Sequence, residues 1–320
     1  MSSDVIEDIQ SFESIVVHHA GFVEAVSHLH LTLKMSAAGA SPKHSLLLGE
    51  SGTGKTWVAK HLQSLYPAGV DGDHLLRPIV CVQTPASPSI KSLAESLLVA
   101  LQDPIPDRGT TTAKRARALH LAKCSKVRMI IFDEFQHFID NGHSNSLQSV
   151  ADWLKGFIDE CEIPCVLMGL PRSAQILRIN EQLRRRFSTH LQLLPFSINS
   201  ALAFEEFQMV LNEFDLALPP SLRCGYAEPD IAKRIFFASN GLIANVRKLV
   251  LGVYELKMLD DRQDPSINLL KRVFTRDIWR EAPTALNPFS EGCTLRLLNK
   301  AGEPFEISAP KTRASIGRRS

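Results

Sequence analysis

Apolar and polar residues follow two different patterns along this chain, and the pattern changes near residue 195. In the first part, short and continuous apolar runs recur, which is typical of strands buried on both faces. These runs cover residues 45–48, 78–83, 127–132 and 164–169. Helical spacing of apolar residues fills the stretches between them, at residues 55–66, 89–101, 113–124 and 147–160. The alternation predicts βαβ units and a parallel sheet.

The rest of the chain is expected to be mostly helical. Residues 12–35 carry apolar side chains at near-helical spacing, which predicts an N-terminal helix before the sheet. After Pro195, the breakers Leu218-Pro219-Pro220 and Asn240-Gly241 separate successive helical patterns. These patterns cover residues 199–213, 228–239, 243–259 and 266–280. Turn residues then flank two short strand-like pieces, at residues 293–298 and 304–308.

Four parts follow from this organisation. Residues 1–40 form a helical lead-in, residues 41–196 an α/β core, residues 197–282 an all-helical lid and residues 283–320 a C-terminal extension. The extension ends in a basic tail, residues 310–320, that contains no acidic residue. The cationic residues of this tail are Lys311, Arg313, Arg318 and Arg319.

Composition excludes several classes of protein. The chain has 320 residues, 44% of them hydrophobic and 22% charged, which excludes general disorder and fibrous proteins. Its net charge is only +2, so a nucleic-acid surface has to come from local clustering of basic residues. The start of the chain lacks the basic n-region of a secretory signal, and no apolar run is long enough to span a membrane. We therefore expect a cytoplasmic protein that does not enter a membrane.

A phosphate-binding loop stands between the first predicted strand and the next helix. Residues 49–56 read Gly-Glu-Ser-Gly-Thr-Gly-Lys-Thr, a complete match to G-x-x-x-x-G-K-[ST]. In such a loop, backbone N–H groups surround the phosphates of ATP, Lys55 binds the β/γ-phosphates and the Thr56 hydroxyl binds Mg²⁺. Trp57 follows directly and is either a further nucleotide contact or a core residue. The nucleotide-binding candidates are Gly49, Glu50, Ser51, Gly52, Thr53, Gly54, Lys55, Thr56 and Trp57.

Two acids end the third predicted strand. Asp133 and Glu134 follow the apolar residues 129–132, at the edge of the sheet where open α/β proteins bind ligands. We expect Asp133 to hold Mg²⁺, directly or through water, and Glu134 to polarise the water that attacks the γ-phosphate. Together with the phosphate-binding loop, the pair predicts hydrolysis of ATP to ADP and phosphate.

Two groups of arginines are further candidates for nucleotide contacts. Residues 181–187 read Glu-Gln-Leu-Arg-Arg-Arg-Phe, and Arg185 or Arg186 is expected to reach the nucleotide of a neighbouring subunit as an arginine finger. A solvated basic helix end is the alternative. Arg247 lies on the opening turns of the helical pattern 243–259, where it would reach the phosphates of its own subunit. For Arg247, an ordinary surface residue is the alternative.

Basic residues cluster between Arg108 and Phe132, where the chain has no Asp or Glu. Lys and Arg without interleaved aromatic residues suit contacts to phosphates, which position a protein on DNA without reading its sequence. An ordinary solvated helix is the alternative. The candidates for DNA contacts are Lys114, Arg115, Arg117 and Lys123.

These motifs in this order resemble the TniB/TnsC family of AAA+ ATPases of DNA transposition. The resemblance covers residues 15–260, from GESGTGKT through PIVCVQTPASPS, VRMIIFDEFQHF and PCVLMGLPRSAQILRINEQLRRRF to GLIANVRKLV. The phosphate-binding loop and the Asp-Glu pair are common to all AAA+ proteins. The DEFQHF run, the Gly-x-Pro after the fourth strand and the ILR…EQLRRRF stretch are the more specific parts.

The resemblance implies a P-loop AAA+ αβα sandwich with a parallel sheet plus a C-terminal all-helical lid. It also implies that ATP and Mg²⁺ are bound, and that a homo-oligomer, a ring or a helical filament, forms on double-stranded DNA. Such an assembly would recruit and activate a transposase and link it to a TniQ-like target-selection adaptor. By the same analogy, the loop at residues 84–89 would reach the central channel.

One departure from the AAA+ pattern affects the expected rate. Many AAA+ proteins carry a polar sensor at the end of the fourth strand, whereas residues 168–171 read Met-Gly-Leu-Pro. Slow hydrolysis, suited to a switch, is therefore expected. Three alternatives remain: another AAA+ ATPase such as a replication initiator or helicase/clamp loader, a non-hydrolytic nucleotide-gated DNA-binding module, and more remotely a nucleotide-gated signalling protein.

Overall fold

Two compact units make up the chain in the computed structural model. The structure describes residue 12 and residues 15–72, 74–141, 144–220, 223–259 and 267–306. The first unit consists of residues 18–195. The second combines residues 1–17 with residues 196–320.

The first unit is built on a five-stranded parallel sheet with the strand order β4-β5-β6-β1-β7. Its strands are β1 (Ser45–Gly49), β4 (Ile79–Gln83), β5 (Met129–Asp133), β6 (Cys165–Gly169) and β7 (Thr189–Leu193). Every residue of β1, β5 and β6 is buried, as expected for inner strands covered on both faces. The four strands predicted from the apolar runs, and their parallel arrangement, are confirmed. This order places the C-terminal ends of β1, β5 and β6 side by side.

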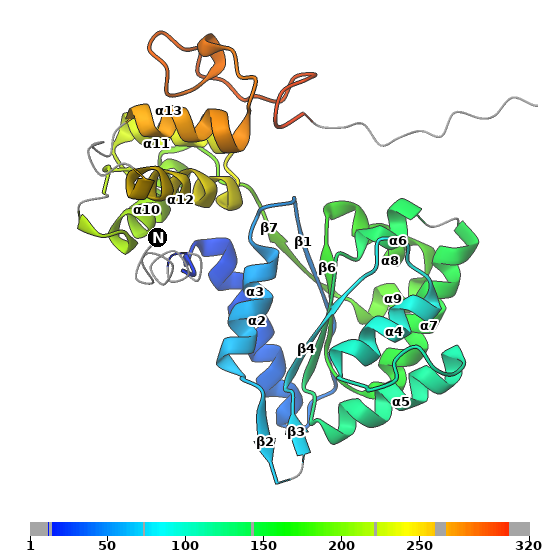
Figure 1. The fold of residues 1–320 in the computed structure, drawn as a ribbon. Helices are drawn as coiled ribbons and strands as arrows, with labels where there is room; N and C mark the ends of the chain where they lie inside the picture. The colour runs from blue at the N-terminus through cyan, green and yellow to red at the C-terminus, as the bar shows by residue number, and fades with distance from the viewer. Residues whose placement is uncertain are drawn as a thin grey trace, which may run out of the picture. The chain divides into compact units, whose positions relative to one another are not determined.

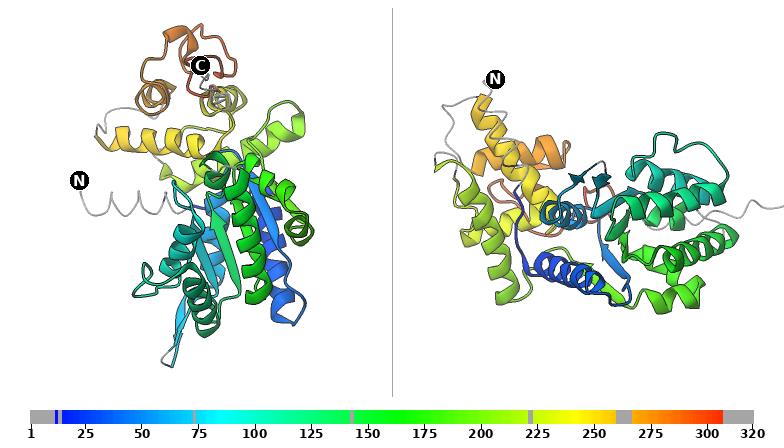
Figure 2. Two further views of the ribbon diagram at one scale, coloured as in Figure 1. Left: turned by 90° about the vertical axis from the view of Figure 1, so that its right-hand side faces the viewer. Right: turned by 90° about the horizontal axis from the view of Figure 1, so that it is seen from below.

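Helices cover both faces of the sheet (Figures 1 and 2). One face carries α2 (Ala20–Ala37) and α3 (Lys55–Leu65). The opposite face carries α4 (Ile90–Ala100), α5 (Thr111–Cys124) and α7 (Ser144–Cys161), which pack against one another. Four short helices complete the unit: α6 (Gln136–Asn141), η1 (Pro171–Gln175), α8 (Ile176–Ile179) and α9 (Glu181–Arg186). Among the helices of the described residues, none has the length and apolar character needed to cross a membrane.

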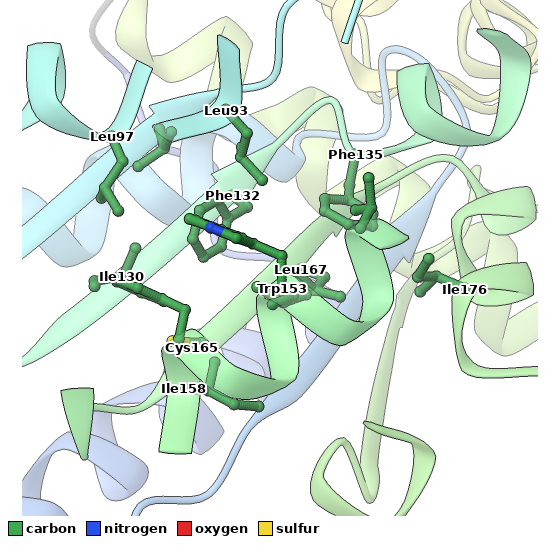
Figure 3. Packing of buried hydrophobic residues seen from close by; sticks show 14 of the residues in the cluster. Leu93, Leu97, Ile130, Phe132, Phe135, Trp153, Ile158, Cys165, Leu167 and Ile176 are labelled. Carbon is green, nitrogen blue, oxygen red and sulfur yellow. The ribbon is translucent and has the colours of Figure 1, made fainter. Parts of the chain in front are cut away.

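A continuous hydrophobic core joins the sheet to the helices of the second face (Figure 3). Successive strand residues point to opposite faces, so Phe132 and Ile130 of β5 enter this core together with Leu167 of β6. The ring of Trp153 in α7 stacks on Phe157 with centroids 5.4 Å apart. This core fixes the strands whose ends carry the acidic residues of the site.

One strand of the sheet and one hairpin of this unit are not predicted by apolar runs. In β7 the buried residues Leu191 and Leu193 alternate with exposed ones, the signature of a half-buried strand. A two-stranded hairpin, β2 (Gly69–Asp71) and β3 (His74–Leu76), extends beyond the sheet in Figure 1. Its residues Val70 and Leu75 are exposed, so burial leaves no pattern in the hairpin sequence.

The N-terminal helix begins later than its apolar spacing predicts. Residues 15–19 are not helical, and α2 starts at Ala20, because the chain passes from the second unit to the first between Val17 and His18. Helix α2 packs against α3 and β7 and therefore belongs to the same unit as the sheet. The prediction of one helix from residue 12 is wrong for residues 15–19.

The second unit is helical, as predicted. Its helices are α10 (Ala201–Ala217), α11 (Pro229–Ser239), α12 (Ile243–Leu259) and α13 (Ile267–Val273), followed by a π-helical turn, η3 (Phe274–Ile278), and a 3-10 turn, η4 (Thr284–Leu286). The Ser200 hydroxyl accepts from the Ala203 N–H and caps α10, while left-handed Asn240 ends α11. These helices share a core that includes Phe207, Phe214 and Val250.

The C-terminal extension packs on this helical core without forming strands. Phe289 and Leu298 are buried in it, and Arg296 pairs with Glu303. Residues 293–306 contain no strand, so the two predicted strand-like pieces are wrong over the part that the structure describes. Residues 293–299 are irregular with one bend, and residues 300–305 form bends and turns. The remainder, including the basic tail at residues 310–320, lies outside the described residues.

Candidate functional site

The phosphate-binding motif forms the turn between β1 and α3. Gly52 and Gly54 adopt positive φ angles of +84° and +97°, a conformation that side chains other than glycine rarely take. A Cβ atom at Gly49 would lie 2.5 Å from both the Leu193 carbonyl oxygen and the Thr53 hydroxyl. The loop therefore needs glycine at these positions for its shape. The N-terminus of α3, where free backbone N–H groups favour an anion, follows directly.

Lys55 lies buried at the first position of α3. Its Nζ donates to the carbonyl oxygens of Gly49 at 2.8 Å and Glu50 at 2.9 Å, which closes the loop around the ammonium group. Burial lowers the pKa of Lys55, while the carboxylates of Glu134, Asp133 and Glu50 oppose that shift. The loop thus holds a cation in place at the position where the motif predicts phosphate oxygens.

The residues after Lys55 differ in their surroundings. Thr56 is exposed, so its hydroxyl is accessible. Trp57 is half-buried in α3, and the Lys60 ammonium lies 4.8 Å from the centroid of its ring. This cation–π contact is within α3, and a nucleotide contact of Trp57 stays a prediction.

Asp133 and Glu134 stand at the end of β5, as the sequence predicts. Asp133 is buried, and its carboxylate accepts from the Glu134 N–H at 2.7 Å and from the Gln83 side chain at 3.3 Å. Burial raises the pKa of Asp133, and these two donors counteract the rise. Glu134 is half-buried and has a φ of +55°, which turns the chain sharply as it leaves the sheet. Lys55 follows the C-terminal end of β1 and the two acids follow that of β5, at the same edge of the sheet, and both carboxylates act on the pKa of Lys55.

The oxygen donors of this site fit a magnesium ion. Mg²⁺ prefers carboxylate and hydroxyl oxygens and retains several waters, and the buried Asp133 carboxylate and the exposed Thr56 residue supply oxygens of these two kinds. Asp133 and Thr56 are the residues that would hold it. When bound, Mg²⁺ would neutralise charge on the β- and γ-phosphate oxygens.

Two glutamines complete the acidic end of the sheet, and the motif analysis does not select either. Gln83, the last residue of β4, holds Asp133. Gln136 is buried and donates to the Glu134 carboxylate, while its Oε1 accepts from the Leu170 N–H at 3.1 Å. Their positions in the sequence could have indicated them, since Gln83 ends an apolar run and Gln136 follows Glu134 by two residues.

The two candidate arginine fingers differ in their contacts. Both lie in α9, where Arg186 donates to the Asp159 carboxylate at 2.6 Å. Arg185 pairs along its own helix with Glu181, at 2.7 Å, and its side chain is 77% exposed. The role of either arginine in a neighbouring subunit's site stays a prediction.

Comparison with known proteins decides the family. The sequence model of the bacterial TniB protein family matches residues 10–195, more than half of the chain. The chain belongs to the TniB family. A search of curated proteins finds no match.

Solved structures similar to this TniB-family protein share its fold. The ORC2 protein of Aeropyrum pernix, in ADPNP-ADP complexes, is 14% identical, with a TM-score of 0.60 over 82% of this chain and 68% of that one. CDC6P from Pyrobaculum aerophilum is 14% identical, with a TM-score of 0.61 over 86% and 74%. The ORC1 protein of Aeropyrum pernix in complex with DNA is 14% identical, with a TM-score of 0.55 over 83% and 66%. The predicted fold, a P-loop AAA+ core with a helical C-terminal part, is confirmed.

In the TniB-family chain, Arg247 contacts the N-terminal segment. This residue of α12 donates to the backbone oxygens of Phe12, at 3.0 Å, and of Ile15, and its guanidinium lies 5.4 Å from the ring centroid of Phe214. Arg247 therefore ties Phe12 and Ile15 to the helical core of the second unit. A phosphate contact of Arg247 stays a prediction.

Most of the candidate DNA contacts of this TniB-family protein are engaged in ion pairs. Lys114 is fully buried, and its Nζ donates to Glu95 at 2.9 Å and to the Pro106 oxygen at 2.7 Å. This geometry argues against a DNA contact by Lys114 and assigns it a structural role. The remaining ion pairs are Arg115 with Glu160 and Arg117 with Asp103. All three acidic partners lie outside the acid-free stretch, so they do not appear in its local charge pattern.

Lys123 is the candidate that stays exposed, near the end of α5. Arg108, which opens the basic stretch, is exposed as well. These two side chains are accessible to phosphates. A role in DNA binding for Lys123 stays a prediction.

Proposed function

We propose that this protein is an ATPase that assembles as a homo-oligomer on double-stranded DNA and regulates transposition. The observation that carries the proposal is the meeting of Lys55, Asp133 and Glu134 at one edge of the sheet in a TniB-family chain. A cation at the opening of a helix and two acids at the same edge of the sheet are the parts that phosphoryl transfer to water requires.

Nucleotide binding begins with the loop between β1 and α3. The Lys55 ammonium exchanges the carbonyl oxygens of Gly49 and Glu50 for phosphate oxygens, and the backbone N–H groups of the loop surround the phosphates. Burial of Lys55 strengthens this interaction, because charges attract more strongly away from water. The ATP γ-phosphate then lies beside the acids that end β5.

In the proposed assembly, Glu134 and an arginine from the adjoining subunit catalyse hydrolysis. The Glu134 carboxylate orients the attacking water and accepts its proton, so that the water oxygen bonds to the γ-phosphorus as the bond to the ADP oxygen breaks. Arg185 or Arg186 of a second copy stabilises the charge that develops in the transition state. Since the site is complete only between subunits, ATP favours assembly.

Contacts within the core support coupling between nucleotide and DNA. The loop at residues 84–89 starts beside the acids, because the Thr84 N–H donates to the backbone carbonyl oxygen of Asp133 at 3.0 Å. The ring of His137 also contacts the Thr84 oxygen, at 3.0 Å. Through these contacts, a change in the bound nucleotide can change the position of the loop. In the proposed assembly, this loop, Arg108 and Lys123 contact phosphates and tolerate any sequence.

The proposed partners are those that the family assignment suggests. We propose that the DNA-bound assembly recruits and activates a transposase, and that a TniQ-like adaptor links it to chosen targets. A transposase tested for binding should prefer the complex formed with an ATP analogue and DNA over the free protein. Equal binding to both would contradict recruitment by the assembly.

The first experiment measures binding to random-sequence duplex DNA by fluorescence anisotropy, at one stated salt concentration. It compares a non-hydrolysable ATP analogue, ADP and no nucleotide. Tight binding only with the ATP analogue supports a nucleotide-assembled DNA regulator. No binding in any state removes the DNA role and points to an ATPase that acts on protein partners.

A non-hydrolytic nucleotide-gated module is the second candidate, because the end of β6 presents no polar side chain at Met168, Gly169 or Leu170. Turnover by the wild type and by Glu134→Gln separates the two. A wild-type rate well above that of the variant supports the ATPase. Equal, near-background rates support the module.

A further inference from the structure

The end of β6 lacks a polar side chain of its own, yet a polar group occupies the space beside it. This group is the amide of Gln136, which opens α6 two residues after Glu134. Only 4% of Gln136 is exposed. A buried polar side chain requires hydrogen-bond partners, and those of Gln136 lie at the ends of two different strands, β5 and β6.

The amide of Gln136 spans from β5 to β6. Its Nε2 donates to Oε2 of Glu134, directly after β5, and its Oε1 accepts from the Leu170 N–H at 3.1 Å, directly after β6. The orientation of the amide follows from its partners, because a carboxylate only accepts and a backbone N–H only donates. A carboxamide offers a donor and an acceptor at once and carries no net charge, which matches these two partners.

Gly169 makes room for this contact. A Cβ atom at Gly169 would lie 2.6 Å from Oε1 of Gln136 and 2.5 Å from the Ser173 hydroxyl, closer than real Cβ contacts come. The Phe135 N–H also donates to the backbone oxygen of Met168 at 3.0 Å, so the backbone directly after Glu134 is joined to β6. Gln136 can therefore reach the end of β6 because Gly169 has no side chain.

We propose that Gln136 is a positioning residue that holds the Glu134 carboxylate in place for attack by water, and that it joins this carboxylate to β6. The inference rests on the proposed ATPase function. Glu134 lies at a positive φ at the end of a strand, so its side chain needs a second fixed point besides its own backbone. Gln136 supplies that point. It would allow hydrolysis although the end of β6 carries no polar side chain of its own.

The test compares Gln136→Met and Gln136→Asn with the wild type. Methionine fills a similar volume but makes neither hydrogen bond, and asparagine is one methylene too short to reach both partners. We expect kcat for ATP to fall about 10- to 100-fold in both variants, as misplacement of a reacting group by about 1 Å does. The Kd for a fluorescent ATP analogue should stay within about twofold, since the hydrogen bonds of Gln136 go to Glu134 and Leu170, which lie outside the phosphate-binding motif. Gln192→Met, at an exposed position of β7, is the matched control and should leave kcat unchanged.

A second variant, Gln136→Glu, keeps the shape and tests the hydrogen bond itself. Two adjacent carboxylates share a proton, so the new acid donates to Glu134 only when it is protonated. The ratio of variant to wild-type kcat should therefore rise by about threefold or more as pH falls from 8.5 to 6. A ratio that does not depend on pH would contradict the role of this hydrogen bond.

The outcomes separate this inference from the proposed function. If the wild type hydrolyses ATP faster than Glu134→Gln, and the Gln136 variants keep or exceed the wild-type kcat, the positioning role is overturned and the ATPase stands. If the wild type turns over no faster than Glu134→Gln, both fall together. Retained folding of each variant is checked by its thermal unfolding and its affinity for the nucleotide analogue.

Discussion

The guanidinium of Arg186 is held by the carboxylate of Asp159, with Nε of the arginine 2.6 Å from Oδ1 of the acid. Asp159 belongs to α7 of the same unit, so this contact ties Arg186 to its own subunit. Arg185, one residue earlier, extends from α9 with 77% of its side chain exposed. Of the two candidate fingers, Arg185 is the one that is open to a neighbouring subunit.

We predict that Arg185→Ala lowers kcat for ATP about 10³-fold in the assembled protein, the lower end of the effect of removing an arginine finger. Nucleotide affinity of the isolated subunit should change little. Arg184→Ala, also exposed on α9, is the control and should retain activity. Mixing Arg185→Ala with Lys55→Ala subunits tests the trans role, because mixed assemblies then contain intact sites. A mixture that stays inactive, or an active Arg185→Ala variant, would contradict this assignment.

Gly49→Ala should destabilise the protein as well as weaken nucleotide binding. Its Cβ would meet the Leu193 oxygen and the Thr53 hydroxyl at 2.5 Å, and overpacking of this kind costs about 1–3 kcal/mol of unfolding free energy. Gly69→Ala is the matched control, since nothing lies within 4 Å of its added Cβ. Urea denaturation of both variants checks the prediction, which fails if they lose equal stability.

His44 predicts a dependence of stability on pH. It is buried before β1, and its Nδ1 accepts from the Cys165 N–H at 3.1 Å, which requires that nitrogen to be unprotonated. Burial lowers the pKa of His44 from 6.5 to about 4, with the charge of Arg186 acting in the same direction and Asp159 against it. The unfolded chain therefore binds a proton between pH 6.5 and 4 that the folded protein does not. Stability falls as pH decreases through this window.

The expected loss is about 3 kcal/mol of unfolding free energy between pH 6.5 and pH 4, from this histidine alone. His44→Asn keeps an acceptor for the Cys165 N–H but does not titrate there, so its stability should depend less on pH over the same range. Denaturation of both proteins in urea at pH 7, 6 and 5 measures the difference. Parallel pH profiles would assign the slope to other groups.

Lys114 and Lys123 lie on the same helix and should give opposite results. Lys114→Met leaves the Glu95 carboxylate without its buried donor and should lower the unfolding free energy by about 1–3 kcal/mol, with no change in the salt dependence of DNA binding. Lys123→Ala should leave stability unchanged and reduce the slope of log affinity against log salt by about 1. Identical salt slopes for the wild type and Lys123→Ala would exclude Lys123 as a phosphate contact.

Local pattern predicted the elements that are long, apolar and regular. Strands β1, β4, β5 and β6 and the helices of the second unit were predicted close to their observed bounds, because burial leaves a strong signal in their apolar residues. Strand β7 and the β2–β3 hairpin were missed, since half-buried or exposed strands carry fewer apolar residues. The start of α2 was misplaced because apolar residues 15–17 pack in the other unit.

The sequence by itself determined the phosphate-binding loop and the Asp-Glu pair, because that chemistry lies within a few consecutive residues. Tertiary structure alone decided that Lys114 is buried against Glu95, that Asp159 holds Arg186 and that Gln136 joins Glu134 to Leu170. Each of these contacts joins different helices or the ends of different strands. The strand order that places β6 between β5 and β1 creates the last of them, and such an order follows from packing of the whole core rather than from any local run of residues.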